Sequence, residues 1–175
     1  MKPSPPEPVT LICGMLSGGP ELFDVAEAEL AARYGPVGLR SPILDFEFTD
    51  YYEPEMGAGL KRRLISFAEK MDPGRLAQIK RETNALEAET AEAEPFVPRP
   101  INLDPGYVCG SKLVLASCKD RAQRIYLGQG VYAEITLAFR GGRFRAVETT
   151  YPDYRSEAYI DFFTRVRRRH LAGGS

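Results

Sequence analysis

The sequence predicts an α+β fold, and three observations support this prediction. Apolar residues recur at helical spacing in separate stretches of the chain. Short apolar or alternating runs between these stretches have the length and spacing of strands. Gly-rich turns at 128–130 and 141–142 join the later strands as hairpins. The expected order is β-α-β-β-α-β, a ferredoxin-like start, followed by an antiparallel β meander and a C-terminal helix.

The first third of the chain is expected to form a lead, a strand and a helix. Residues 1–8 contain four prolines and predict a flexible lead. Residues 9–16 are a continuous apolar run, typical of a buried strand. Pro20 suits the first position of a helix, and the apolar residues from Phe23 to Tyr34 then recur at helical spacing.

Two further strands are expected before residue 70. Residues 44–48 alternate apolar and acidic side chains with period two, as a half-buried strand does. Residues 60–67 fit either a helix or a strand. We favour a strand, because a Gly-rich segment precedes these residues and suits a hairpin connection.

The rest of the chain is expected to be a helix, a sheet and a closing helix. The helix that begins after residue 72 has Asp72 as its N-cap and leads to a Pro-rich connector at 94–100. The closing helix ends in an arginine cluster at 165–169, where cations complement the helix dipole. This cluster could contact RNA, but we favour a solvated helix end. Residues 172–175 are expected to be a frayed tail, which leaves 9–171 as a single domain. The predicted strands of this part are 113–116, 124–127, 131–140 and 143–147.

Two short motifs have both a structural and a functional interpretation. Asp104 lies in Asn102–Tyr107, where Asp-Pro-Gly predicts a turn, although Asp104 would also suit a metal ligand or a base. Gly14–Pro20 lies between a strand and a helix, where backbone N–H groups bind phosphate in other proteins. The Walker pattern is absent here, so we favour a plain turn.

Composition argues against several classes of protein, and it disfavours a nucleic-acid partner without excluding one. The formal net charge is −1, so no overall field attracts nucleic acid or acidic membranes. No apolar run is long enough to span a bilayer, and the proline-containing start differs from a signal peptide. We therefore expect a cytoplasmic protein whose three cysteines are reduced thiols. The single histidine disfavours most histidine-based metal sites.

Polar side chains between residues 102 and 139 predict a ligand site. Tyr132, Glu134 and Thr136 are expected to share one face of a strand, with Val131, Ala133, Ile135 and Leu137 on the other. A carboxylate opposite basic residues suits a phosphate or carboxylate ligand, but a solvated face with weak ion pairs would look the same. The predicted catalytic residues are Asp104 and Glu134, and the predicted ligand-binding residues are Asp50, Tyr52, Asn102, Tyr107, Lys112, Lys119, Arg124 and Tyr132.

Seven segments together resemble a bacterial family known as domain of unknown function 4416. They are FTDYYEPEMG (48–57), GLKRRLISF (59–67), IKRETNALE (79–87), NLDPGYV (102–108), SKLVLAS (111–117), RIYLGQGVYAEITL (124–137) and TYPDYRSEAYIDFF (150–163). The resemblance covers nearly the whole chain from Val9 and implies no specific activity. Family members often have His before Arg-Ile-Tyr, where this chain has Gln123. If that His has a chemical role, this chain lacks it.

Three functional hypotheses follow, and the sequence leaves open whether the protein is an enzyme. The leading one is binding, with or without processing, of a small anionic molecule such as a phosphorylated metabolite or nucleotide. Asp104 and Glu134 would either hold a divalent cation as cofactor or shuttle a proton. The alternative is a module that binds protein or RNA through aromatic and arginine surfaces. The third is that the polar clusters are structural.

Overall fold

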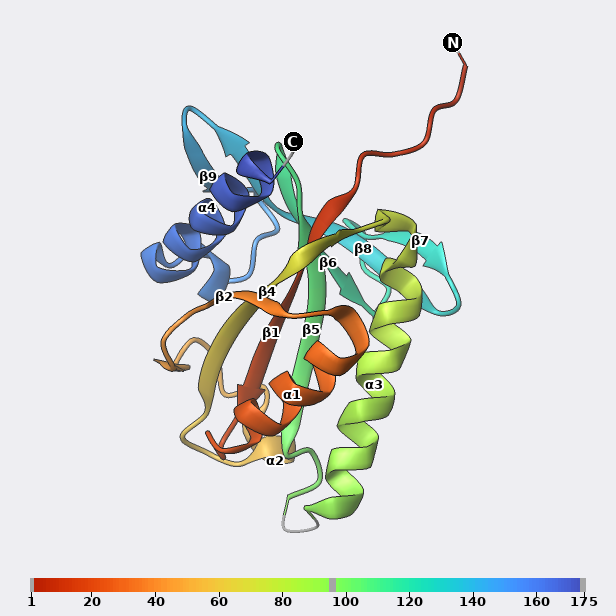
Figure 1. Cartoon of the computed structure of the whole chain (residues 1–175). Coiled ribbons are helices and arrows are strands. Elements are labelled where there is room, and N and C mark those ends of the chain that lie inside the picture. The colour runs from red at the N-terminus through yellow and green to blue at the C-terminus, as the bar shows by residue number, and fades with distance from the viewer. Residues whose placement is uncertain (1, 95–96, 174–175) are drawn as a thin grey trace.

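A nine-stranded sheet forms the centre of the computed structural model, which describes residues 2–94 and 97–173 (Figure 1). The strands are β1 (Val9–Ser17), β2 (Val37–Arg40), β3 (Leu44–Asp45), β4 (Lys61–Met71), β5 (Ile101–Val108), β6 (Lys112–Ser117), β7 (Ile125–Gly128), β8 (Val131–Arg140) and β9 (Arg143–Ala146). The helices are α1 (Leu22–Tyr34), α2 (Glu53–Met56), α3 (Leu76–Ala93) and α4 (Glu157–Ala172). Short 3-10 turns lie at Pro73–Arg75 and Asp153–Arg155.

The strand order is β2-β4-β1-β5-β6-β8-β7, with β3 paired to β4 and β9 paired to β8. Every strand pair among the described residues is antiparallel. The mixed α and β content, the meander and the C-terminal helix are confirmed. The ferredoxin-like start is not confirmed, since its split βαβ unit has parallel strands, whereas β1 is antiparallel to both of its neighbours.

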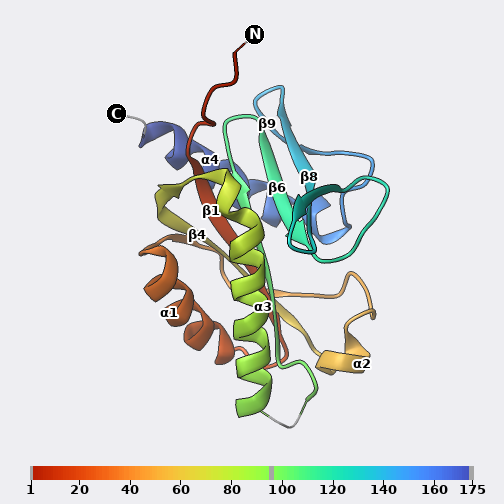
Figure 2. The ribbon, with the colours of Figure 1, turned by 90° about the vertical axis from the view of Figure 1, so that its right-hand side faces the viewer.

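Helices cover both faces of the sheet (Figures 1 and 2). Alternation along β1 sends Leu11, Cys13 and Met15 into a core with α1 and α3. Ile12, on the opposite face, joins a second core with α4 that includes Phe163. We call these two sides the α3 face and the α4 face. No helix among residues 2–94 and 97–173 has both the length and the apolar content for a membrane crossing.

Several predicted elements are confirmed. Residues 61–67 of the predicted strand 60–67 do form a strand, as part of β4, because that segment is paired with β1 on one side and β2 on the other. Asp72 caps the helical segment by accepting a hydrogen bond from the Gly74 N–H at 2.8 Å. Gly141 and Gly142 form the predicted hairpin turn, and both have positive φ, at 57° and 80°.

In the first half, one predicted strand was mostly wrong and one strand was missed. Only Leu44 and Asp45 of the predicted strand 44–48 pair with a neighbour, as β3. The chain then turns so that Phe46 packs against Leu60 and Met56 beneath α2, which removes residues 46–48 from the sheet. The strand β2 was missed, because its partly exposed four residues carry no clear alternation. Pro20 precedes α1, which begins at Leu22.

The predicted turn at Asp104-Pro105-Gly106 was also wrong, because β5 runs straight through it. Pro105 lacks an N–H and usually breaks a central strand. Here the pairing of β5 with β6 covers only Gly106–Val108, so Pro105 has a paired neighbour on one side alone. Gly14 likewise lies inside β1, and the turn before α1 is the short segment after Ser17.

The predicted faces of β8 hold except at Leu137. A register shift between β6 and β8 pairs Val114 with Ile135 but Leu113 with Leu137. The extra residue returns Leu137 to the α4 face, where it joins the core. Ala172, expected in the tail, still belongs to α4. Residues 174–175 of the predicted tail, 95–96 of the connector and Met1 of the lead lie outside the described residues.

Candidate functional site

A buried arginine organises the α4 face of the sheet. Arg62 lies on β4 between Leu60 and Leu64, and its side chain is 2% exposed. Its Nη1 donates to Asp104 Oδ2 at 3.1 Å, and its Nη2 donates to Asp153 Oδ2 at 3.3 Å. Because β4 and β5 flank β1, two strands and the turn before α4 bring these three charges together.

Gly14 on β1 makes room for this arrangement. Gly14 pairs with Leu64 on one side and with Asp104 on the other. A Cβ at this position would lie 3.2 Å from both Arg62 Nη1 and the Tyr154 hydroxyl. A larger residue would therefore push the arginine and the tyrosine away from the strand.

Three polar atoms around Arg62 have no hydrogen-bond partner among the described residues. They are Arg62 Nε and the hydroxyls of Tyr154 and Tyr159, whose residues are 2%, 2% and 1% exposed. The two tyrosine rings contact each other, with centroids 5.3 Å apart, and the Tyr159 hydroxyl faces Arg62 without a well-formed hydrogen bond. Buried polar groups are nearly always paired, so three together need an explanation. We call Arg62, Asp104, Asp153, Tyr154 and Tyr159 the Arg62 cluster.

The two carboxylates of the cluster differ. Burial alone would raise the pKa of Asp104, but the charges of Arg62 and Lys80 hold this pKa below its ordinary value. Burial raises the pKa of Asp153 above its ordinary value, because the opposing charge of Arg62 is the smaller effect. The Asp104 side chain is also 25% exposed, whereas that of Asp153 is 8% exposed. Asp104 is therefore the accessible, charged member.

Polar side chains extend the cluster along the part of β5 that is not paired with β6. Asn102 donates to Asp104 Oδ2 at 2.7 Å and accepts from Arg99. From α3, Glu87 accepts from the Leu103 N–H at 2.6 Å and Lys80 donates to the Leu103 carbonyl at 2.7 Å. These two charged side chains satisfy backbone groups that a strand would otherwise bond, so their role is structural.

A second arginine cluster lies at the end of β6. Arg124 Nε donates to Glu134 at 3.1 Å, and both side chains are at most 5% exposed. The other guanidinium nitrogens donate to Ser117, to the Lys119 carbonyl and to the Tyr151 hydroxyl, at 2.6–2.8 Å. In this Arg124 cluster each guanidinium nitrogen therefore has at least one acceptor, and the cluster holds the loop between β6 and β7 in place.

Two tyrosine segments connect the clusters. Tyr51 accepts from Lys119, whose ammonium lies 4.7 Å from the Tyr51 ring centre. The adjacent Tyr52 is close enough to Asp104 for that charge to reinforce burial in raising its pKa. Near α4, Tyr151 bonds Arg124 and Asp153 bonds Arg62. The two clusters therefore belong to one region of the molecule.

The structure brings together some of the predicted site residues and separates others. Tyr107 packs on the α3 face, and strand alternation places Lys112 there too, opposite Leu113. Tyr132 pairs with Ser117 on the α4 face, beside the Tyr126 ring at 5.2 Å. The residues in the region of the two clusters are Tyr52, Asn102, Asp104, Lys119, Arg124, Tyr132 and Glu134.

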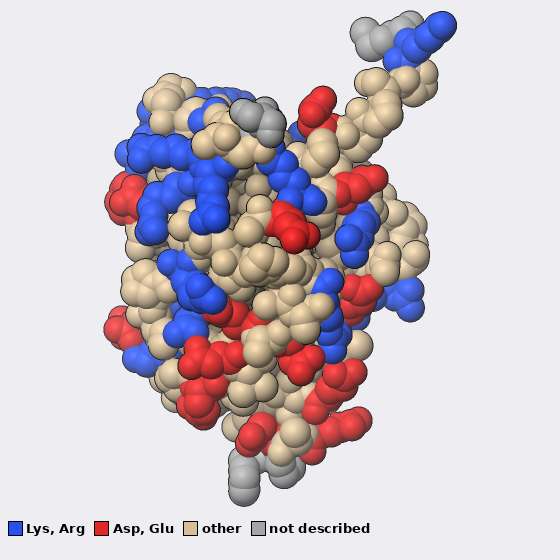
Figure 3. Space-filling view, in the orientation of Figure 1, with Lys and Arg blue, Asp and Glu red and all other residues tan. Residues whose placement is uncertain are grey.

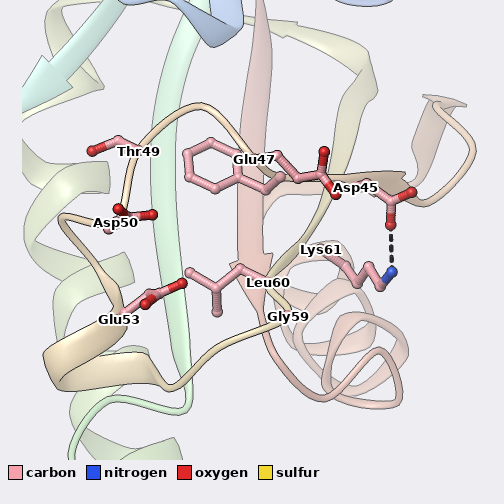
Figure 4. Close-up of a pocket in the computed structure, with 9 residues that line it drawn as sticks. Asp45, Glu47, Thr49, Asp50, Glu53, Gly59, Leu60 and Lys61 are labelled. Carbon is pink, nitrogen blue, oxygen red and sulfur yellow. Dashed lines mark hydrogen bonds and ion pairs between the residues drawn. The ribbon is translucent and has the colours of Figure 1, made fainter.

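Asp50 lines a separate surface cavity of about 300 Å3 (Figure 4). The side chains of Glu47 and Glu53 surround it as well, and Asp45 is bonded to Lys61 at one side. Of the predicted site residues, Asp50 alone lines this cavity. Within the described residues, no three His, Cys, Asp or Glu side chains are arranged to hold a metal ion.

A comparison with family models matches residues 7–170 to the family described as Domain of unknown function (DUF4416). The chain belongs to this family. The resemblance seen in the sequence is confirmed over nearly the whole chain. No curated protein and no solved structure matches this DUF4416 chain.

Four residues of the Arg62 cluster, Arg62, Asp153, Tyr154 and Tyr159, were missed from the sequence. Arg62 shares the period-two face of Leu60 and Leu64, so the strand pattern itself places a charge in the core. Asp153 was not among the predicted site residues, but its carboxylate pairs with Arg62. Tyr154 and Tyr159 carried no signal that separates them from core aromatics. Gln123, where family members often have His, donates to Glu134 at 3.2 Å.

Proposed function

We propose that this DUF4416 protein binds a small anionic molecule, such as a phosphorylated metabolite or nucleotide, at the Arg62 cluster. The observation that supports this proposal is the set of three unpartnered polar atoms around Arg62. Arg62 Nε carries a hydrogen to donate, and each tyrosine hydroxyl can donate as well. Neighbouring donors without partners suit the oxygens of a phosphoryl or carboxylate group.

Asp104 supplies the complementary acceptor. Its Oδ2 is bonded to Arg62 and Asn102, while no hydrogen bond to Oδ1 occurs within the described part of the chain. With a lowered pKa, Asp104 is charged at neutral pH and accepts a hydrogen bond from a ligand hydroxyl or amide. A carboxylate with a lowered pKa is a weak base, so the proposal is binding rather than proton transfer.

We expect proton uptake when the anion binds. Arg62 is already opposed by two carboxylates, Asp104 and Asp153. The raised pKa of Asp153 marks it as the group that takes up a proton as the ligand enters. Arg124 already donates to acceptors of the chain itself. Lys119 therefore makes the outer contact with the anion.

We propose a cytoplasmic location for the protein. The three cysteines, Cys13, Cys109 and Cys118, form no disulfide in the described structure, which suits a reducing compartment. Fractionation of cells that express the tagged protein tests this, since recovery in an exported fraction would contradict it.

A thermal-shift screen tests the binding proposal. The wild-type protein is heated with a panel of nucleotides, sugar phosphates and inorganic phosphate, each with and without divalent ions. We expect at least one anion to raise the melting temperature, and Tyr154→Phe to lose that rise because it lacks one donor. Tyr107→Phe is the matched control, since Tyr107 lies on the α3 face and no hydrogen bond of its hydroxyl occurs among the described residues. No shift with any anion, in a folded protein, contradicts the proposal.

A further inference from the structure

The exposed side of α4 carries cations that its own fold does not neutralise. Arg165, Arg167, Arg168 and Arg169 lie in its C-terminal half. Within the described chain, none of these four has a carboxylate oxygen within 4.0 Å. Figure 3 shows basic side chains gathered over the α4 end of the molecule, while acidic side chains gather at the opposite end. A chain of net charge −1 therefore presents one strongly basic surface.

Neighbouring elements add like charge to this helix. Arg167 Nε donates to the Gly110 carbonyl at 2.7 Å, in the turn that Lys112 closes by accepting from the Cys109 N–H at 3.0 Å. At the end of β4, Lys70 is near His170 and, together with burial and Arg167, lowers the pKa of that histidine. We call the four arginines, with Lys70, the α4 basic surface. The sequence alone gave no sign of basic residues beside the helix.

Two of the arginines are held in place by the protein. The Arg167 guanidinium lies 3.4 Å from the centre of the Phe139 ring, and Arg169 donates to the Gly38 carbonyl at 2.7 Å. Arg165 and Arg168, by contrast, are exposed and have no hydrogen bond within the described residues. A surface with some cations fixed and others available suits the binding of successive phosphates.

We propose that the α4 basic surface binds the phosphate backbone of a nucleic-acid duplex. Arginine donates to phosphate oxygens through two nitrogens at once, and all the helical cations here are arginines. Protein interfaces centre on buried aromatic and aliphatic anchors, but Leu171 is the one large exposed apolar side chain described on α4. Single strands stack on exposed aromatic rings, and the described part of α4 exposes no large one. A duplex needs neither feature.

Fluorescence anisotropy with a labelled duplex of mixed sequence tests this proposal. Arg165→Gln/Arg168→Gln removes two phosphate contacts, and Arg81→Gln/Arg121→Gln removes the same charge from exposed positions elsewhere. We expect the α4 variant to bind roughly tenfold more weakly, with the slope of log K against log salt reduced by about 2. The control is expected to bind like the wild type.

Other polyanions distinguish the proposal from nonspecific attraction. Phosphatidylserine vesicles and an acidic peptide are titrated under the same salt conditions. We expect the duplex to bind more tightly than either. Equal loss of duplex binding in the two double variants overturns the proposal, because charge alone would then matter. The proposal is also overturned if the protein binds the vesicles or the peptide but does not bind the duplex. Failure here leaves the Arg62 proposal intact, since the thermal-shift screen tests that one separately.

Discussion

The Arg62 and Arg124 clusters are built from the same parts and differ in how completely they are bonded. Each has an arginine that is at most 3% exposed, paired with carboxylates and bordered by tyrosines. Arg124 uses all its nitrogens on acceptors supplied by the chain. Arg62 leaves Nε unpartnered beside two unpartnered hydroxyls, within the described structure. The bonds of Arg124 are explained by its role in holding the loop between β6 and β7. The Arg62 cluster, by contrast, leaves donors for a ligand or for ordered water.

Removing Arg62 is expected to have the largest effect. Arg62→Met leaves Asp104 and Asp153 close together without their cation, which should lower the free energy of unfolding by about 3–5 kcal/mol. Urea denaturation measures this loss, with Arg81→Met as an exposed control expected to change stability by about 0.5 kcal/mol or less. A loss in Arg62→Met no greater than in the control would show that the cluster does not support the fold.

Glu134→Gln separates the two clusters by function. Its side chain accepts from Arg124 and Gln123, so the variant should lose about 1.5–3 kcal/mol of stability through weakened charged hydrogen bonds. Anion binding should be unchanged, because the Arg62 cluster keeps its donors. Ligand titration of the folded variant decides the matter: a lost ligand response would place Glu134 in the site and contradict the division drawn above.

Acidification should change the contributions of the two carboxylates to the free energy of unfolding in opposite directions. Asp104 has a lowered pKa, so its contribution is present above pH 3.8 and is lost as the pH falls through the folded value. Asp153 has a raised pKa, so its contribution favours the folded state at low pH and is lost as the pH rises from 3.8 through the folded value. Asp104→Asn should therefore lose less stability on acidification than the wild type, and Asp153→Asn more. Parallel curves for the two variants would contradict these assignments.

The exposed contact between Tyr51 and Lys119 should matter least for stability. A hydrogen bond from Lys119 and its positive charge lower the pKa of Tyr51. Lys119→Met should return this tyrosine to ordinary titration without a measurable change in melting temperature. The ultraviolet difference spectrum between each protein and its Tyr51→Phe counterpart isolates this one tyrosine among nine. An unchanged titration midpoint would mean that the contact does not persist in solution.

Local patterns predicted the elements whose signals lie within one segment. β4, the meander and α4 were predicted from their periodicity and turn residues. The strand β5 was missed because Pro105 and Gly106 are turn residues by local preference, and only the one-sided pairing with β1 makes a strand there possible. Register, and hence the direction of Leu137, depended on a bulge that no local signal marks.

The site was predicted only in part for the same reason. Asp104, Glu134, Arg124 and Lys119 were selected by residue type, and the structure places them in one region. Arg62 was overlooked, although it interrupts an apolar face of its strand. Which arginine is saturated depends on contacts between segments far apart in sequence, such as Arg62 with Asp153, and single-sequence patterns do not contain this information.

The most direct test of the Arg62 proposal is calorimetric titration of Tyr154→Phe with the anion that most stabilises the wild type. Without ligand, the variant should be as stable as the wild type or more stable, because the missing hydroxyl has no partner within the described residues. With ligand, we expect at least a fivefold weaker affinity, or about 1 kcal/mol for one lost hydrogen bond. Wild-type affinity in a folded Tyr154→Phe would contradict the proposal that the unpartnered donors of the Arg62 cluster bind the ligand.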